Sequence, residues 1–261
     1  RKRRTLSAEL RQQWLLPKAL VQSQLLELVG ALREGLQRLF PTPWPLPIET
    51  QPASRVADER FQKTLAEMTQ LFDTAVDVYF AKDLHGYVLS LEAPAPGQRP
   101  VVVLDLTALS RTEAEQRYLL GRALEPVRGG YAPLLRLTES ETERLVRLLL
   151  SLATNPGQLD PASQEFLLQL PESSQQAVLG VLGQLQAQAQ AIAASASQPA
   201  SASEPRALLS VHEFLQVLPL CADRAGLVAA DDIAATIRTM ARAQGEELEL
   251  VEADTGSNVD R

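Results

Sequence analysis

One stretch of the sequence, from Val76 to Arg128, constrains the fold more than any other. It holds three short runs rich in valine, tyrosine, phenylalanine and leucine, separated by breaks with glycine and proline, and such runs are typical of β-strands. A helical pattern follows directly, because Thr112 stands three residues before Glu115 and in front of an apolar run, as in a capping box. We therefore expect a small sheet, at about residues 76–105, that leads into a capped helix.

Outside this stretch, apolar residues recur at helical spacing. The periodic segments lie at residues 7–40, 58–72, 138–153, 159–170, 171–194, 210–230 and 233–244. Together with the small sheet, they predict an α+β fold that is mostly helical. Pro219 stands inside one of these segments, and because proline removes a backbone hydrogen bond we expect it to kink or restart that helix.

The sequence divides into three parts by composition. We expect residues 1–50 to form N-terminal helices and a proline-rich connector, and residues 51–244 to form one domain. Within this domain, residues 195–205 are mostly serine, alanine and proline, which predicts a flexible loop. Residues 245–261 are acidic and have little to bury, which predicts a disordered tail. The sequence begins with arginine rather than methionine, and we expect it to be joined to an upstream region of a longer chain.

Composition argues against several classes of protein. The net charge is −7, whereas a general nucleic-acid binder needs a basic surface. No apolar run reaches the roughly 18 residues of a membrane-spanning helix, so we expect no membrane span. The single cysteine, Cys221, rules out an internal disulfide framework and indicates a reducing compartment, which we take to be the cytoplasm.

Two fragments resemble zinc metallopeptidases of the gluzincin kind, close to the HtpX and CAAX prenyl protease group. The first is SRTEAEQRYLLGRALEPV at residues 110–127, and the second is LCADRAGL at residues 220–227. In that family the first fragment carries the zinc-binding motif His-Glu-x-x-His, and a glutamate beside the second fragment supplies the third zinc ligand. The resemblance covers roughly residues 61–240 and implies a zincin fold, with the capped helix as the helix of the active site.

Every metal ligand of the family motif is replaced in this chain. Arg122 stands where the first histidine would be, Ala123 where the catalytic glutamate would be, and Pro126 where the second histidine would be. Pro219 takes the place of the third ligand, whereas Asp223, which supports the ligands in the family, is kept. Because a catalytic zinc needs three protein ligands and its water needs a general base, we expect no catalytic residue, no bound metal and no cofactor.

Arg122 and Asp223 allow two interpretations. In one, the arginine pairs with the aspartate, so that an ion pair replaces a metal cross-link between two helices. In the other, Arg122 is exposed and Asp223 forms local hydrogen bonds or caps a helix. The sequence alone leaves both open.

Other residues give little support for a different mechanism. The chain has two histidines, His85 and His212, and His212 is nine residues before Cys221 in one predicted helix. That spacing is about 13 Å along a helix axis, too far for a nucleophile and its base. We therefore interpret the chain as a pseudoenzyme that acts as a protein-interaction, scaffolding or regulatory module.

The context of this module is also an expectation. The chain resembles the C-terminal part of large helical-repeat proteins of bacteria, and its partners would be proteins whose identity the sequence does not give. Two alternatives stay open. The chain could be a substrate or regulatory target of a partner protease, cut most easily at residues 195–205. It could also be a hydrolase with relocated chemistry.

Overall fold

The computed structural model describes residues 5–17, 44–84, 87–94, 97–138 and 211–243, with shorter runs and single positions within 29–40, 140–145 and 161–187. Several predicted segments lie outside the described residues. They are residues 18–28, 146–153, 159–160 and 188–194 of the predicted helical segments, the flexible loop at 195–205 and the disordered tail at 245–261.

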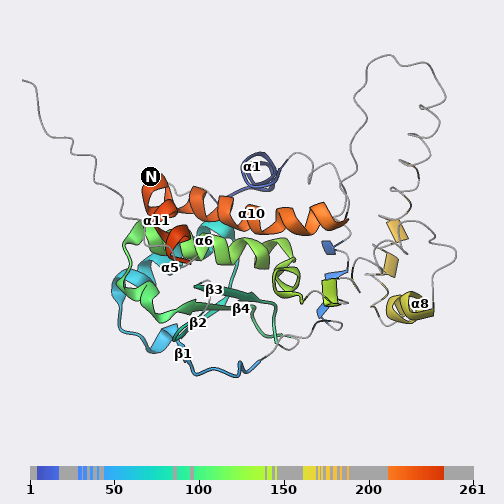
Figure 1. Ribbon diagram of the computed structural model, residues 1–261, viewed down its shortest axis with the longest axis horizontal. Helices are drawn as coiled ribbons and strands as arrows, with labels where there is room; N and C mark the ends of the chain where they lie inside the picture. The colour runs from blue at the N-terminus through green and yellow to red at the C-terminus, as the bar shows by residue number, and fades with distance from the viewer. Residues whose placement is uncertain are drawn as a thin grey trace, which may run out of the picture.

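The described residues confirm the predicted α+β, mostly helical fold (Figure 1). In chain order, its elements are α1 (Ala8–Trp14), β1 (Thr50–Pro52), the 3-10 helix η1 (Ala53–Arg55), α5 (Glu59–Phe72), β2 (Asp77–Ala81), β3 (Val88–Leu91), β4 (Val101–Asp105), η2 (Leu106–Ser110), α6 (Glu113–Gly129), η3 (Ala132–Arg136), α8 (Pro161–Leu168), α10 (Val211–Ala230) and α11 (Ile233–Ala243). None of the described helices is long and apolar enough to cross a membrane.

The described strands form one four-stranded sheet in the order β1-β2-β4-β3. Strands β2 and β4 are parallel, whereas β1 pairs antiparallel with β2 and β3 pairs antiparallel with β4. Three of these strands lie where the sequence predicts the sheet. The fourth, β1, lies outside that range and was missed, because three residues that end in Pro52 are too short to show an alternating pattern. A proline is compatible with this position because β1 is at the edge of the sheet.

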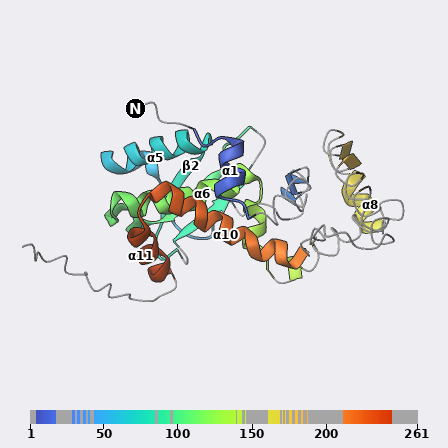
Figure 2. The same cartoon turned by 90° about the horizontal axis from the view of Figure 1, so that it is seen from above.

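Helices cover one face of the sheet, with α5 and α6 packed directly on it (Figures 1 and 2). Phe61 of α5 contacts Phe80 of β2 edge to face, with ring centroids 5.0 Å apart. The N-terminal segment joins the same core through Leu6 and Leu15. A smaller cluster covers the opposite face, where the Trp44 ring lies 4.8 Å from the Tyr79 ring. The sheet is therefore buried on both sides.

Helix α10 lies along α6 on the side away from the sheet (Figures 1 and 2). It is one helix through Pro219, so the predicted restart at this proline is wrong. The proline is exposed, whereas Phe214 and Leu218 beside it are fully buried. Burial of the opposite face of the helix therefore offsets the roughly 3 kcal/mol that an interior proline costs.

Candidate functional site

The candidate site lies where α6 and α10 approach each other most closely. A Cβ atom added to Gly121 of α6 would lie 2.6 Å from the Cβ atom of Ala229, and one added to Gly226 of α10 would lie 2.6 Å from the ring of Tyr118. Real Cβ atoms do not approach other atoms so closely, so each of these positions requires glycine. The contact places the middle of α6 directly beside the C-terminal third of α10.

This contact brings Arg122 and Asp223 together. The Nε atom of Arg122 lies 2.8 Å from Oδ1 of Asp223, and the side chains are 30% and 21% exposed. The hydroxyl of Tyr118 donates a second hydrogen bond to the same carboxylate oxygen, at 3.1 Å. Burial, and then the negative charge of Asp223, raise the pKa of Tyr118, so its hydroxyl stays protonated as a donor. Of the two interpretations that the sequence left open, the ion pair is confirmed.

The other residues aligned with the metal site occupy different environments. Pro219 is exposed on α10 and lines the same cavity as Arg122. Ala123 and Pro126 are buried in α6. The carbonyl of Ala123 accepts a hydrogen bond from the hydroxyl of Ser90, at 2.8 Å, which ties the helix to β3. Of the aligned positions, the structure therefore groups Arg122, Pro219 and Asp223 at one place.

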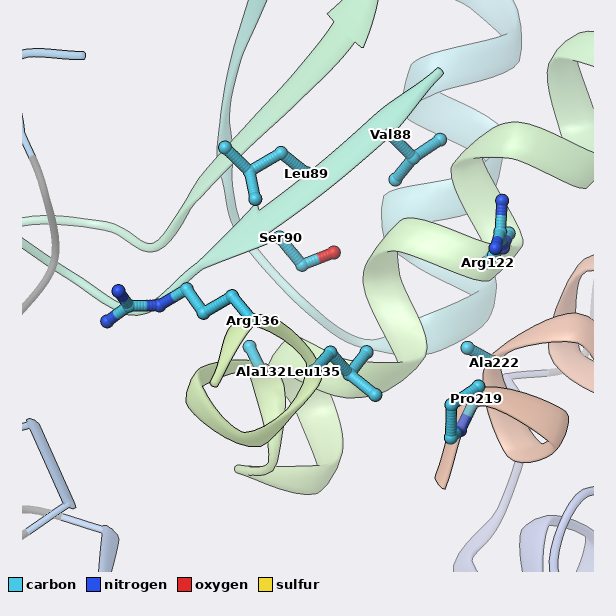
Figure 3. Close-up of a pocket in the computed structure, with 9 residues that line it drawn as sticks. All are labelled: Val88, Leu89, Ser90, Arg122, Ala132, Leu135, Arg136, Pro219 and Ala222. Carbon is cyan, nitrogen blue, oxygen red and sulfur yellow. The ribbon is translucent and has the colours of Figure 1, made fainter. Parts of the chain in front are cut away.

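A cavity of about 290 Å³, which we call the groove, opens beside this ion pair (Figure 3). Its walls come from four elements: β3 with Val88, Leu89 and Ser90, α6 with Arg122, η3 with Ala132, Leu135 and Arg136, and α10 with Pro219 and Ala222. The guanidinium of Arg136 points away from the groove in Figure 3 and donates to the carbonyl of Phe40, at 2.6 Å. Six of the nine lining residues are apolar, and the charge of Arg122 is balanced by that of Asp223.

Strand β3 contributes an open edge to the groove. The amide of Asp105 donates to the carbonyl of Tyr87, and this bond fixes which residues face β4. In an antiparallel pair, alternate residues bond with the neighbouring strand. Leu89 and Leu91 therefore bond with β4, whereas Val88 and Ser90 direct their backbone N–H and C=O groups outward. Among the described strands, none pairs with β3 on that side.

Buried ion pairs join α6 and the end of β3 to other parts of the chain. In the described part of the chain, four buried glutamates pair with arginines that are distant in sequence. These pairs are Arg11–Glu125 (2.7 Å), Arg33–Glu92 (2.5 Å), Arg117–Glu67 (2.5 Å) and Arg242–Glu115 (2.7 Å). Sequence analysis missed all four, because no motif links residues that are far apart in the chain.

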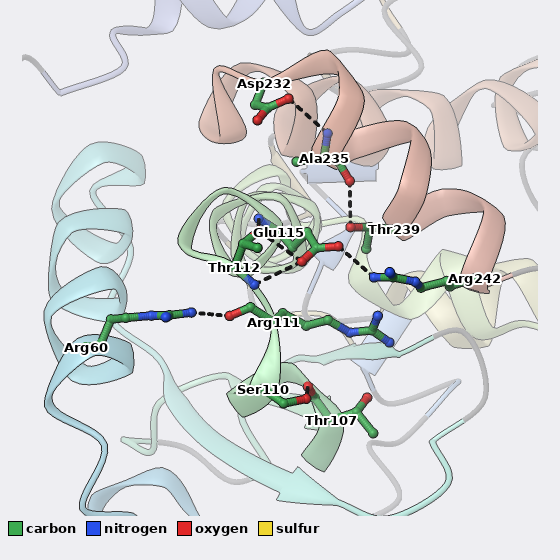
Figure 4. A network of polar contacts seen from close by, with 10 residues as sticks. All are labelled: Arg60, Thr107, Ser110, Arg111, Thr112, Glu115, Asp232, Ala235, Thr239 and Arg242. Carbon is green, nitrogen blue, oxygen red and sulfur yellow. Dashed lines mark hydrogen bonds and ion pairs between the residues drawn. The ribbon is translucent and has the colours of Figure 1, made fainter. Parts of the chain in front are cut away.

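The Glu115 carboxylate shows how one of these pairs is built (Figure 4). The predicted capping box is confirmed, since Thr112 donates to Glu115 through its amide and its hydroxyl, both at 2.9 Å. Nη1 of Arg242, on α11, donates a further hydrogen bond to Oε1 of Glu115, at 2.7 Å. Burial acts to raise the pKa of Glu115, but the hydrogen bonds from Thr112 and the charge of Arg242 outweigh it and lower that pKa. The carboxylate therefore joins the start of α6 to α11.

The residues that most often bind metals or act as nucleophiles do not form a cluster among the described residues. No group there of three or more histidine, cysteine, aspartate or glutamate side chains has the arrangement of a metal site. Cys221 is a free, buried thiol, and burial, followed by the charge of Glu125, raises its pKa to about 12. His85 and the side chain of His212 lie outside the described residues.

The sequence was compared with known proteins in three ways. Comparison with protein-family models finds no match, and comparisons with curated proteins and with solved structures find none either. The likeness to zinc metallopeptidases therefore stays a prediction that depends on the two sequence fragments.

Proposed function

We propose that this chain is a non-catalytic protein-interaction module of a larger bacterial protein, and that it binds its partner in the groove. One observation carries the proposal. Arg122, which stands at the position that the resemblance assigns to the first zinc ligand, pairs with Asp223, while the groove beside the pair stays open. A site of this kind keeps the shape of a binding surface without the groups that polarise a water or a peptide carbonyl. The free thiol of Cys221 supports a reducing compartment, the cytoplasm.

The groove favours an extended peptide segment as the ligand. An exposed strand edge offers unpaired N–H and C=O groups, and an incoming strand can pair with them. Val88 and Ser90 present such groups to the groove. Leu135, Pro219 and Ala222 supply apolar walls, and Leu135 is 38% exposed, so a partner side chain can cover it. We expect the bound segment to carry small or apolar side chains, because these walls are apolar and Arg122 is paired with Asp223.

A proline at position 88 tests this mode of binding. Because the amide of Val88 points away from β4, Val88→Pro removes a donor for the partner without breaking a bond of the sheet. Peptides selected from a phage-displayed library with the unaltered chain should bind the variant at least about tenfold more weakly, which is a loss of about 1.4 kcal/mol. The melting temperature of the variant serves as the control. It should fall, because Tyr87 has φ 62° and a following proline disfavours that conformation, so binding is compared at a temperature where the variant is still folded.

Two outcomes would contradict the proposal. If the library yields no peptide that binds the unaltered chain, the groove is not a peptide site. If the selected peptides bind Val88→Pro as tightly as the original, they do not pair with β3. Binding would be measured by fluorescence anisotropy with the selected peptides in labelled form.

The non-catalytic part of the proposal needs a separate experiment. We expect the purified chain to contain no stoichiometric zinc, to melt at the same temperature with and without added zinc, and to leave a fluorogenic casein substrate uncut. A stoichiometric metal or a zinc-dependent rise in melting temperature would restore the hydrolase alternative, because it would reveal ligands that neither the motif nor the described residues provide.

A further inference from the structure

Four polar side chains, two buried and two half-buried, lie where the N-terminal segment meets the end of α6. The Nε atom of Arg11 lies 2.7 Å from Oε1 of Glu125, whose side chain is fully buried. Arg128 donates from Nη2 to the carbonyl of Leu6, at 2.6 Å. Tyr131, just beyond the helix, is also fully buried. These contacts fasten residues 5–16 to the helix that carries Arg122.

Each of the four side chains has one buried polar atom that makes no hydrogen bond within the described part of the chain. Within the described part of the chain, Nη2 of Arg11, Oε2 of Glu125, Nη1 of Arg128 and the hydroxyl of Tyr131 are buried without a hydrogen-bond partner. Native proteins rarely leave buried polar atoms unpaired, because they lose their bonds to water without replacement. Four such atoms in one place therefore require an explanation.

Arg11 connects this group, because it contacts both Glu125 and the region beside Tyr131. A Cβ atom added to Gly129 would lie 2.6 Å from Nη2 of Arg11 and 2.5 Å from Cε1 of Tyr131, so both groups meet at this glycine. Glu125 and Arg128 are three residues apart on α6 and therefore lie on the same face of the helix. The charge of Glu125 also acts on Tyr131, whose pKa is raised first by burial and then by that charge.

We propose that one internal water molecule lies among Arg11, Glu125, Arg128 and Tyr131 and completes their hydrogen bonds. The chemistry of the four atoms selects this ligand. The two guanidinium groups only donate and would repel a cation, whereas the Glu125 carboxylate only accepts and would repel an anion. Water both accepts and donates, and internal waters typically make about three bonds to atoms of this kind. The water would accept from the arginines and donate to Oε2 of Glu125.

Such a water would make the N-terminal segment part of the site's framework. Glu125 is three residues beyond Arg122 on the same helix, so the segment that Glu125 holds is attached to the helix that carries Arg122. The inference does not depend on the proposed function, because it concerns the attachment of the segment and not what the groove binds.

The variant Tyr131→Phe tests the proposal by the sign of its effect on stability. If the hydroxyl bonds to an internal water, its removal should lower the melting temperature of the full chain by about 2–4 °C and accelerate amide exchange at Leu10 and Arg11. If the hydroxyl is truly unpaired, its removal relieves a buried polar atom, and the melting temperature should stay the same or rise. That result would overturn the proposal. Tyr79→Phe, at a half-buried tyrosine, is the matched control.

A crystal structure of the full chain at high resolution gives a direct and independent answer. We expect electron density for a water within hydrogen-bond distance of Oε2 of Glu125 and of the Tyr131 hydroxyl. A direct hydrogen bond between these two side chains, or an empty gap among the four, would overturn the proposal even if Tyr131→Phe were destabilised.

Discussion

Replacing Arg122 by glutamate should lower the free energy of unfolding by about 2–4 kcal/mol. The substitution removes a charge-assisted hydrogen bond of 2.8 Å, and such bonds contribute about 1.5–3 kcal/mol when buried. Because the two side chains are 30% and 21% exposed, solvent screening reduces this loss to about 1–2 kcal/mol. The new carboxylate then repels Asp223 at short range, which adds about 1–2 kcal/mol in a partly exposed environment.

Urea denaturation at low salt measures this loss. A double-mutant cycle with Arg122→Met and Asp223→Asn should give a coupling energy of about 1 kcal/mol. Arg224→Glu is the matched control, since Arg224 is exposed on α10, next to Asp223. Reversing its charge should change the free energy of unfolding by no more than about 0.5 kcal/mol. If Arg122→Glu is no more damaging than Arg224→Glu, or if the coupling energy is zero, the pair does not join the two helices.

Three further experiments examine the surroundings of the site. Gly226→Ala should lower the free energy of unfolding, measured with urea, by about 1–3 kcal/mol, because its Cβ atom would lie 2.6 Å from the Tyr118 ring. The control Gly180→Ala, in open space on a helix, should raise it by up to about 1 kcal/mol, and equal effects of the two variants would refute the close contact of the helices. Because the pKa of Glu115 is lowered, its charge stabilises the fold above the ordinary pKa of 4.5, and this stability is lost as the pH falls through the lowered value. Between about pH 5 and about pH 3, the free energy of unfolding should therefore fall less steeply in Glu115→Gln than in the unaltered chain, and parallel curves would contradict this prediction. Cys221, buried and with its pKa raised to about 12, should react with a thiol reagent at about pH 8 only as fast as the chain opens; rapid reaction of the folded chain would show that the thiol is accessible.

The sequence predicts the elements whose signals are local. Helix α5 begins where Asp58 caps it by accepting from the amide of Phe61, and α6 begins at the capping box of Thr112 and Glu115. Each cap joins residues three positions apart, so a short window of sequence contains the whole interaction. Strand β1 has no such signal, because three residues near Gln51 become a strand only by pairing with β2.

Contacts between distant residues limit what could be predicted about the site. The two sequence fragments place Arg122 and Asp223 on separate predicted helices, but their meeting depends on glycines that permit those helices to touch. The pair of Arg11 and Glu125 joins residues 114 positions apart and has no motif at either end. Pro219 shows the reverse case, in which a strong local signal for a break is overridden by tertiary packing.

The contact of α6 with α10 also determines how freely this chain can change in length. The two helices are held together by glycine contacts and an ion pair, and these contacts do not involve the segment between them in the sequence. For flexible connections in general, doubling the length costs only about 0.6 kcal/mol of closure entropy. Insertions between Arg136 and Val211 that spare buried positions such as Leu145 and Leu170 should therefore be tolerated during evolution, while substitutions at the two glycines should not.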